Sequence, residues 1–438
     1  MKTKRSKRNL ILFIISYTLS NLISGILYDS YVNYLQEVHS SIAMSFWAFY
    51  GYSTFIAAVL LLLVHLLGYK RLLLWCTVSS ALAFYAIIFI KWKFIFTVAT
   101  ILALSGVQLH YVILAPFIAT YTSSLQKENI NWYSRAYYMG YIGYFITTFL
   151  GGFLTVKFFS MRAGIGFDAA KNLTKNISEM SASTYAMYMK GSEDVFILTA
   201  ILATLAIIPI KLIKEEKSDY WKLEITENNI IDRTRTQFKL FFNKDALVYI
   251  AYWSVISFAM GLFTSYYTVY LNRNLHIDRA TSSLMVSVSY IAMIIFVFLT
   301  PICVKKIGSI GTICVTVLAS IPFMLLIANG ERFGHLMIPV VGAALFMRAG
   351  LANLSGPAES SLSMEIIPVN QRPAYNSLIN TLSGLVSIAS GIFTGKFLFV
   401  NQSGYKHAYY IAAVLYLIAA MILFIGLRKK NNKDGMSE

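Results

Sequence analysis

The polar stretch from Lys211 to Lys244, KLIKEEKSDYWKLEITENNIIDRTRTQFKLFFNK, stays charged for longer than any other segment before the C-terminal tail. The apolar segments on either side of it repeat at a nearly fixed offset. Three landmarks show the repeat: Gly68 and Gly308 are 240 residues apart, Pro116 and Pro357 are 241 apart, and Arg135 and Arg372 are 237 apart. An internal repeat at a constant offset indicates duplication. The sequence therefore predicts two similar halves joined by a polar linker.

The composition predicts that both halves lie in a membrane. Of the 438 residues, 57% are hydrophobic and 13% are charged, and the mean hydropathy is +0.62. A water-soluble domain could not bury so much apolar surface. The three cysteines, Cys76, Cys303 and Cys314, fall in or beside the apolar segments, so we expect no disulfide framework, metal site or redox cofactor. The apolar run after MKTKRSKRNL is too long for a signal peptide and is interpreted as a retained first span.

The apolar runs predict an all-α polytopic membrane protein with twelve transmembrane helices in two pseudo-symmetric six-helix bundles. The expected domains are an N-terminal half (1–210), a linker (211–244), a C-terminal half (245–427) and a tail (428–438). The longest loop on the outer side is expected at about 160–194. The twelve helices are expected at 10–35, 42–67, 72–90, 94–121, 135–159, 194–213, 246–271, 282–304, 309–328, 335–363, 373–400 and 405–427.

The loop charges predict the orientation. With both termini in the cytoplasm, the inside segments carry 24 Lys and Arg residues and the outside segments carry 12. This bias places the linker inside the cell, in what we expect to be a bacterial plasma membrane. The net charge of +17 then reflects topology and attraction to the lipid bilayer, and binding to nucleic acid is the weaker interpretation.

Two stretches carry a family resemblance. The more specific is PAESSLSMEIIPVNQRPAYNSL, Pro357 to Leu378, and its first-half counterpart begins with PFIATYTSSL at Pro116. Together with the twelve-helix plan, these stretches resemble the major facilitator superfamily. The stretch from Pro357 to Leu378 is similar to that family's end of helix ten, the turn after it and the start of helix eleven. The resemblance implies a secondary carrier that works by alternating access, and it covers nearly the whole chain.

The chain also departs from that family's pattern. The loop after the second helix in such carriers commonly reads G-x-x-x-D-R-x-G-R-[KR]. Alignment on Gly68 puts His65 at the Asp position, and alignment on Gly308 puts Lys305 there, so the acidic latch is missing from both halves. In helix five, the G-P-x-x-G-G run of drug and metabolite antiporters is replaced by TTFLGG at 147–152, which argues against a specific assignment as a drug/proton antiporter.

Polar faces on four helices are the candidates for a central solute cavity, because lipid would demand apolar residues there. The alternative for each face is helix packing or an interfacial tyrosine belt. The faces are Tyr17, Asn21, Ser24, Tyr28 and Tyr31 on helix one; Tyr249, Trp253, Ser257, Met260, Thr264 and Tyr267 on helix seven; Tyr137, Tyr141, Tyr144 and Thr148 on helix five; and Asn376, Asn380, Ser383, Ser387 and Ser390 on helix eleven.

Arg348 is the one basic residue expected deep within a span, roughly 20 Å from the outer boundary at the ~1.5 Å rise of a helix. An arginine there costs about 2.5–3.5 kcal/mol on insertion scales, so it should face the protein interior. It is predicted either to receive an anionic or hydrogen-bonding solute or to pair with a carboxylate or helix carbonyl groups. Glu359 continues the same face beyond a bend expected at Gly356-Pro357.

Three residues are candidates for proton coupling: His110 in helix four, Asp29 near the outer end of helix one, and Glu359. Histidine titrates near neutral pH, but a lone membrane histidine is also a common packing residue. Asp29 is equally compatible with a solvated rim position. The residues expected to bind the solute are Tyr17, Asn21, Tyr28, Gln108, Tyr141, Trp253, Tyr267, Arg348 and Asn380.

No enzyme motif stands out: the sequence has no phosphate-binding glycine loop, no spaced metal ligands and no nucleophile elbow. Without a strongly placed carboxylate, the cavity favours a neutral polar or anionic small molecule over a cation. We therefore predict a secondary transporter, proton-linked or a uniporter, that acts as a monomer without a cofactor. The alternatives are a multidrug efflux carrier, a lipid flippase or polytopic transferase, and a receptor-like remnant of a carrier.

Overall fold

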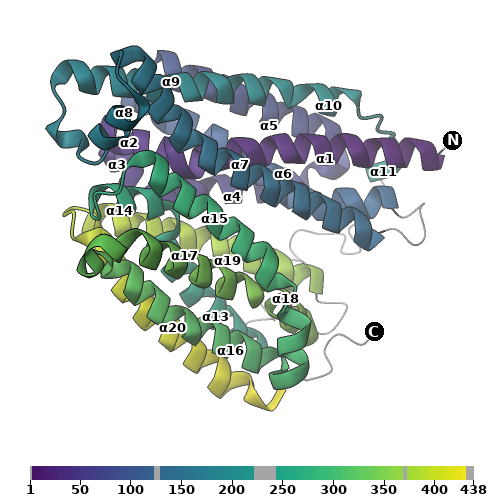
Figure 1. Cartoon of the computed structure of the whole chain (residues 1–438). Coiled ribbons are helices and arrows are strands. Elements are labelled where there is room, and N and C mark those ends of the chain that lie inside the picture. Colours follow the sequence, from purple (N-terminus) through teal and green to yellow (C-terminus); the bar gives the residue numbers. More distant parts are fainter. Residues whose placement is uncertain (1, 123–128, 221–242, 368–371, 431–438) are drawn as a thin grey trace. The chain divides into compact units, whose positions relative to one another are not determined.

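The computed structural model describes residues 2–122, 129–220, 243–367 and 372–430, and in these ranges it contains helices and no strand (Figure 1). Eleven of the described helices are long and apolar enough to cross a membrane, and a shorter apolar helix covers Phe46–Leu61. The prediction of an all-α protein with twelve spans is thus confirmed. The chain forms two compact units: unit 1 comprises Met1–Ile225 and Asp278–Leu284, and unit 2 comprises Thr226–Ile277 and Met285–Glu438.

Unit 1 contains helices one to six. Helix one is continuous through a π-helical turn, and helices two and six are each interrupted once. The elements are α1 (Lys2–Ile26), η1 (Leu27–Tyr31), α2 (Val32–Val38), α3 (Ser40–Met44), α4 (Phe46–Leu62), α5 (Val64–Phe89), α6 (Lys93–Thr122), α7 (Asn129–Ala163), α8 (Phe167–Leu173), η2 (Ile177–Glu179), α9 (Ala182–Leu205), α10 (Ile207–Leu212) and α11 (Lys217–Tyr220).

Unit 2 contains helices seven to twelve apart from the start of α15, with breaks in helices seven and ten. The break in helix ten falls at Ser355, immediately before the Gly356-Pro357 pair at which the sequence predicts a bend. The elements are α13 (Lys244–Gly261), η3 (Thr264–Tyr266), α14 (Tyr267–Arg273), α15 (Arg279–Val297), α16 (Thr300–Ala328), η4 (Gly330–Leu336), α17 (Met337–Leu354), α18 (Gly356–Glu365), α19 (Arg372–Phe393), η6 (Thr394–Leu398), α20 (Gly404–Leu427) and η7 (Arg428–Lys430).

The segment predicted as a long outer loop at about 160–194 is largely helical, and helix six begins earlier in it than predicted. It contains α8, and α9 begins at Ala182, twelve residues before the predicted start of helix six. The Ser181 hydroxyl accepts the Thr184 backbone N–H and so caps α9, which lets the helix begin among polar residues. Apolar side chains of α8 and α9 then pack with Val156 and Phe159 of α7. Hydropathy alone did not reveal these helical segments, because α8 and the first turns of α9 consist largely of polar and small residues.

A matching backbone break marks the same place in both halves. Gly68 has φ 79° and ψ 162°, and Gly308 has φ 79° and ψ 168°. Only glycine adopts this conformation without strain. The 240-residue repeat seen in the sequence is therefore repeated in the backbone.

In unit 1 the break at Gly68 leaves the next backbone N–H groups without acceptors from the helix. A carboxylate from the start of the linker accepts them instead. The Glu215 carboxylate accepts the N–H groups of Tyr69 at 2.8 Å and Lys70 at 3.1 Å. The Lys70 ammonium also donates to the Ile213 carbonyl oxygen. Burial raises the pKa of the Glu215 carboxyl, while these N–H groups act in the opposite direction. The loop sequence itself lacks an acidic residue at this place. Glu215, about 150 residues further along the chain, supplies the carboxylate instead.

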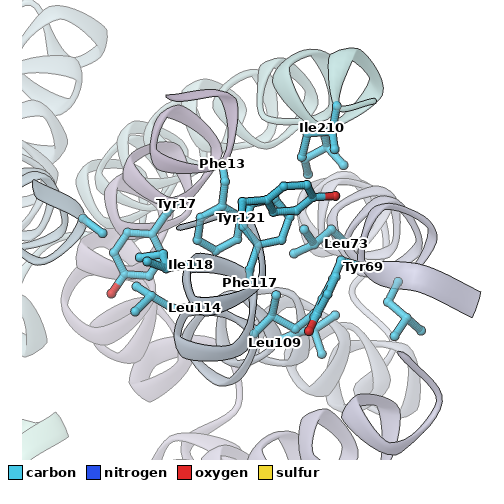
Figure 2. Packing of buried hydrophobic residues seen from close by; sticks show 14 of the residues in the cluster. Phe13, Tyr17, Tyr69, Leu73, Leu109, Leu114, Phe117, Ile118, Tyr121 and Ile210 are labelled. Carbon is cyan, nitrogen blue, oxygen red and sulfur yellow. The ribbon is translucent and has the colours of Figure 1, made fainter. Parts of the chain in front are cut away.

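The main apolar core of unit 1 joins α1, α5 and α6 (Figure 2). Phe13 stacks on Phe117 with ring centroids 4.3 Å apart, and Tyr69 meets the same ring edge-on. Tyr17 is part of this cluster. Close packing of this kind, more than removal of water, holds helices together in a membrane.

Candidate functional site

The polar face of helix one divides into a buried part and a half-buried part. Tyr17 is 2% exposed and its ring lies edge-on to Tyr111. Asn21, also 2% exposed, donates to the Tyr17 carbonyl oxygen and accepts a 2.5 Å hydrogen bond from the Tyr111 hydroxyl. Both residues therefore serve the contact between helices one and four in this structure. Tyr28, two turns further along, is half-buried.

Tyr28 is the centre of a polar aromatic group in unit 1. The Gln108 side-chain amide on α6 donates to the Tyr28 hydroxyl at 3.0 Å. The Tyr144 ring on α7 lies nearly parallel to the Tyr28 ring, with centroids 6.2 Å apart, and Tyr50 on α4 lies at 6.1 Å. Helices one, two, four and five thus bring together three aromatic rings and an amide. Such a group can stack on a solute ring and bond to its polar edge.

Arg348 occupies the corresponding place in unit 2. It is 3% exposed; its guanidinium donates to the hydroxyls of Tyr267 at 2.8 Å and Tyr416 at 2.7 Å, and it lies 4.6 Å from the Phe263 ring centroid. Its Nε is buried and has no hydrogen-bond partner. In the described part of the chain no carboxylate pairs with this arginine. The charge is therefore held by hydroxyls and a π face, with donor capacity to spare.

The contacts of Gln108 and Arg348 are equivalent under the internal repeat. Gln108 and Arg348 are 240 residues apart, and their partners Tyr28 and Tyr267 are 239 apart. In each unit a planar donor from helix four or ten reaches a tyrosine hydroxyl on helix one or seven. The sequence predicted all four residues as solute-binding candidates, and the structure joins them in two pairs.

Glu359 lies on α18 and is held by hydroxyl groups. Its Oε1 accepts the Tyr252 hydroxyl at 2.6 Å and the Ser355 hydroxyl at 3.0 Å, and its backbone carbonyl accepts the Tyr249 hydroxyl at 3.0 Å. None of the ion pairs among the described residues includes it. Within the described part of the chain, the carboxyl group therefore faces hydroxyl donors and no basic side chain pairs with it.

His110 lies in the packing contact between α6 and α1. Its Nδ1 is 2.7 Å from the Gly106 carbonyl oxygen, and its Nε2 is 3.0 Å from the Ser16 hydroxyl. A carbonyl oxygen can only accept, so Nδ1 carries the hydrogen and Nε2 accepts from Ser16 in the neutral ring. His110 is two residues from Gln108, and residues so spaced do not share a helix face.

Asp29 is buried, not a solvated rim residue, and sequence reasoning missed its partner. Asp29 is 2% exposed and pairs with Arg279, the first residue of α15, at 2.7 Å between Oδ2 and Nη2. From the sequence, Arg279 is only one of the charges of an outside loop. The pairing carries no local sequence signal, because the two residues are 250 positions apart. Tyr416 was missed for the same reason.

The remaining predicted residues are placed separately. Tyr141 on α7 is half-buried, and Asn380 on α19 is exposed within an apolar span. Trp253 on α13 is half-buried, and its indole N–H has no hydrogen-bond partner. The exposed amide of Asn380 inside a span fits a surface that meets water or solute, whereas the indole nitrogen of Trp253 is buried. Asn376 has a side chain outside the described part. In the described part no three His, Cys, Asp or Glu side chains gather as a metal site would need.

Solved structures of membrane transporters share this fold over nearly its whole length. A mutant form of the nucleoside transporter NupG has 13% identity and a TM-score of 0.74, covering 95% of this chain and 99% of its own. A D-xylose-proton symporter has 14% identity and a TM-score of 0.68, covering 98% and 99%. A bacterial homolog of the human lysosomal transporter Spinster, inward-facing and occupied, has 12% identity and a TM-score of 0.65, covering 98% of each chain. At these identities the likeness shows the fold alone.

The sequence itself identifies the family. No curated protein matches the chain as a sequence relative. The family model described as Major Facilitator Superfamily matches residues 181–390 and 259–435, which together span more than half of the chain. Proteins with this model and fold are multi-pass membrane transporters and not enzymes. The chain belongs to the major facilitator superfamily.

Proposed function

We propose that this protein is a secondary transporter that moves a neutral polar or anionic small molecule across the plasma membrane by alternating access. The observation that carries the proposal is the pair of equivalent contacts, Gln108 with Tyr28 and Arg348 with Tyr267. Each puts hydrogen-bond donors and aromatic rings inside a span, where lipid would exclude them. The positive charge of Arg348, which has no carboxylate partner among the described residues, favours an anionic or hydroxyl-rich solute over a cation.

Transport is further proposed to be proton-linked, with Glu359 as the group that carries the proton. Asp29 is neutralised by Arg279, and both ring nitrogens of His110 have partners that suit the neutral ring. Glu359 accepts hydrogen bonds from two hydroxyls, and no ion pair found in the described part of the chain includes it. A half-buried carboxylate inside a span is costly without a counter-charge, and a proton removes that cost. We therefore prefer Glu359 to His110, and a uniporter is the remaining possibility.

The orientation and setting are part of the proposal. The twofold excess of Lys and Arg in the linker, tail and even-numbered loops places both termini and the linker in the cytoplasm. We propose a bacterial plasma membrane, a monomer as the working unit, and no nucleic-acid partner. The rocking bodies are residues 1–210 and 245–438, joined by the 211–244 linker.

Glu359 also gives the alternative function its support. A carrier of cationic amphipathic compounds needs a buried carboxylate to match the desolvated charge, and Glu359 could serve as one. Its Oε1 is engaged by Tyr252 and Ser355, however, whereas Arg348 keeps an unused N–H donor. The neutral or anionic solute is therefore preferred.

Counterflow in liposomes tests the proposal. The purified protein would be reconstituted and loaded with unlabelled uridine, D-xylose, L-lactate or ethidium, and uptake of the same labelled compound would be followed. We expect counterflow with at least one of the first three probes and none with ethidium. Counterflow with ethidium alone would establish the cationic alternative, and an absence of counterflow with all neutral, anionic and cationic probes would support the remnant hypothesis.

A further inference from the structure

One end of unit 1 joins the start of α1 to the end of helix six (Figure 1). Asn9 is fully buried there and contacts Lys214 twice: its amide donates to the Lys214 carbonyl oxygen at 2.8 Å, and its side-chain oxygen accepts the Lys214 backbone N–H at 3.0 Å. The Arg8 guanidinium donates to the Leu212 carbonyl oxygen at 2.6 Å. These contacts hold the basic residues of the two segments close together.

Four basic side chains lie around this join, and all four are exposed. They are Lys4 and Arg8 on α1, Lys211 on α10 and Lys214 just after α10. Lys4 and Arg8 are four residues apart, so they lie on one face of the helix. In the described part of the chain, no ion pair includes any of the four.

The acidic residues just after the join are already engaged. The Glu215 carboxylate accepts two backbone N–H groups of α5. Glu216 and Asp219 both pair with Arg5. Arg5 follows Lys4 directly, so its side chain points roughly 100° away from that of Lys4 around the helix. These acids therefore leave the positive charges of Lys4 and the other three basic residues uncompensated.

Exposed apolar side chains continue from these charges along both helices. On α1, the face that carries Lys4 continues with Ile11 and Ile15, which are 50% and 45% exposed. The polar face with Tyr17 and Asn21 lies roughly 120° away around the same helix. An apolar face exposed within a span meets lipid chains. The exposed apolar residues of helix six near this end are Leu205, Ile208 and Leu212.

We propose that these four basic residues, Lys4, Arg8, Lys211 and Lys214, form a binding site for one anionic phospholipid, whose acyl chains lie on the exposed apolar faces of α1 and helix six. A lipid phosphate accepts hydrogen bonds from Lys and Arg, and basic residues at the end of a span attract anionic headgroups. A free phosphate ion would match the charges but would leave both apolar faces without a partner. The site lies within unit 1 and on a different face of α1 from the solute candidates, so it goes beyond the proposed function and depends on neither the solute nor the direction of transport.

Native mass spectrometry of the purified protein in detergent tests the site. Palmitoyl-oleoyl phosphatidylglycerol and phosphatidylcholine with the same chains would each be titrated, and the fraction of protein with one bound lipid would be measured. We expect phosphatidylglycerol to bind about tenfold or more tightly, because each Lys or Arg near an anionic headgroup strengthens binding about fivefold. Equal binding of the two lipids would overturn the proposal, since the surface would then be ordinary lipid-facing surface.

The double variant Lys4→Gln/Lys211→Gln removes two charges of the site and leaves the Arg8 and Asn9 contacts in place. We expect it to weaken phosphatidylglycerol binding about tenfold or more and to leave phosphatidylcholine binding unchanged. Lys305→Gln/Lys306→Gln is the matched control, because it removes two exposed lysines from unit 2 at the membrane face predicted to be the same. It should keep the preference for phosphatidylglycerol. An equal loss in both variants would show that total charge, and not this site, selects the lipid.

Photolabelling of the parent protein locates the site without any variant. Phosphatidylglycerol with a diazirine near the head of one acyl chain would be cross-linked in liposomes, and the labelled peptides would be sequenced. We expect labelling within residues 4–15 and 205–214, reduced by unlabelled phosphatidylglycerol and not by phosphatidylcholine or inorganic phosphate. Labelling confined to other segments would reject the site, and competition by inorganic phosphate would identify a simple anion site instead. Counterflow is measured separately, so failure of this site leaves the transport proposal standing.

Discussion

At the scale of single residues, the unusual feature of this protein is a buried arginine that contacts hydroxyls and keeps one N–H without a partner. Arg348 contacts Tyr267 and Tyr416, and the fork of its guanidinium reaches both at once. A lysine could keep the charge but could not span the two hydroxyls in the same geometry. The partly unused guanidinium is the clearest reason to look for a solute at this position.

Substitutions of Arg348 should separate the effect of its positive charge on transport from the effect of its side-chain geometry. We expect Arg348→Lys to lower the counterflow rate severalfold and Arg348→Gln to lower it by about tenfold or more, because only the glutamine removes the positive charge. Tyr416→Phe, which keeps both the ring and the arginine, is the control and should retain most transport. Wild-type counterflow in Arg348→Gln, at normal membrane levels, would assign Arg348 a structural role.

Proton coupling should depend on Glu359 and not on His110. Glu359→Gln removes the titrating group but keeps an acceptor for Tyr252, so we expect accumulation driven by a pH gradient to be lost while counterflow persists. His110→Gln can keep hydrogen bonds to Gly106 and Ser16, and we expect both activities to persist. The opposite pattern in the two variants would move the coupling to His110, and a parent protein indifferent to the gradient would be a uniporter.

At the scale of elements, the repeated break at the start of helices three and nine is set by a glycine. Gly68 and Gly308 share φ 79° with ψ near 165°, a region that side chains with a Cβ avoid. The turn after Gly68 is then completed by Glu215 from the start of the linker. The backbone conformation of Gly68 and the carboxylate of the distant Glu215 thus together determine the structure of this turn in unit 1.

We expect Gly308→Ala and Gly68→Ala each to destabilise the protein by about 1–3 kcal/mol, the usual cost of a strained backbone position. Thermal unfolding in detergent would measure the loss. Gly342→Ala is the matched control: a Cβ there meets only the Met285 Cε at 3.8 Å, within a helix, so this variant should be neutral or slightly stabilising. An equal effect in Gly342→Ala would show that the backbone conformation is not the cause.

At the scale of the whole molecule, the chain is two six-helix units whose polar faces carry equivalent contacts, and one helix, α15, has residues in both units. A transporter that works by alternating access needs its two ends to open in turn. Helices one and seven carry the equivalent tyrosines Tyr28 and Tyr267. Cysteines placed in these two helices should therefore show how accessible each end of the transporter is.

Single cysteines at the two ends of these helices should change accessibility in opposite senses when a transported solute is added. Suitable buried positions are Ser6 and Gln36 in helix one and Ala246 and Asn272 in helix seven. The measurement is the rate of maleimide labelling from each side of the membrane, with the probe that gives counterflow. Labelling that rises or falls together at both ends would reject the two-gate mechanism.

The sequence by itself determined the class, the number of spans, the repeat and the residue types placed in the membrane. These follow from local quantities: apolar runs long enough to cross lipid, 3.6-residue periodicity, and a constant 240-residue offset. The same quantities missed α8 and the start of α9 in the 160–194 segment, because a helix made largely of polar and small residues does not differ in hydropathy from a polar loop.

Only the tertiary structure decided which polar residues meet. Tyr17 and Tyr28 belong to one stripe in the sequence, yet one is packed in the core and the other joins Gln108. The pairs Asp29–Arg279 and Tyr69–Glu215 join residues 250 and 146 positions apart. Such contacts depend on the rotation of each helix about its axis and on the close approach that glycines such as Gly152 allow. Packing of all the helices together sets both, and no local pattern of residues encodes them.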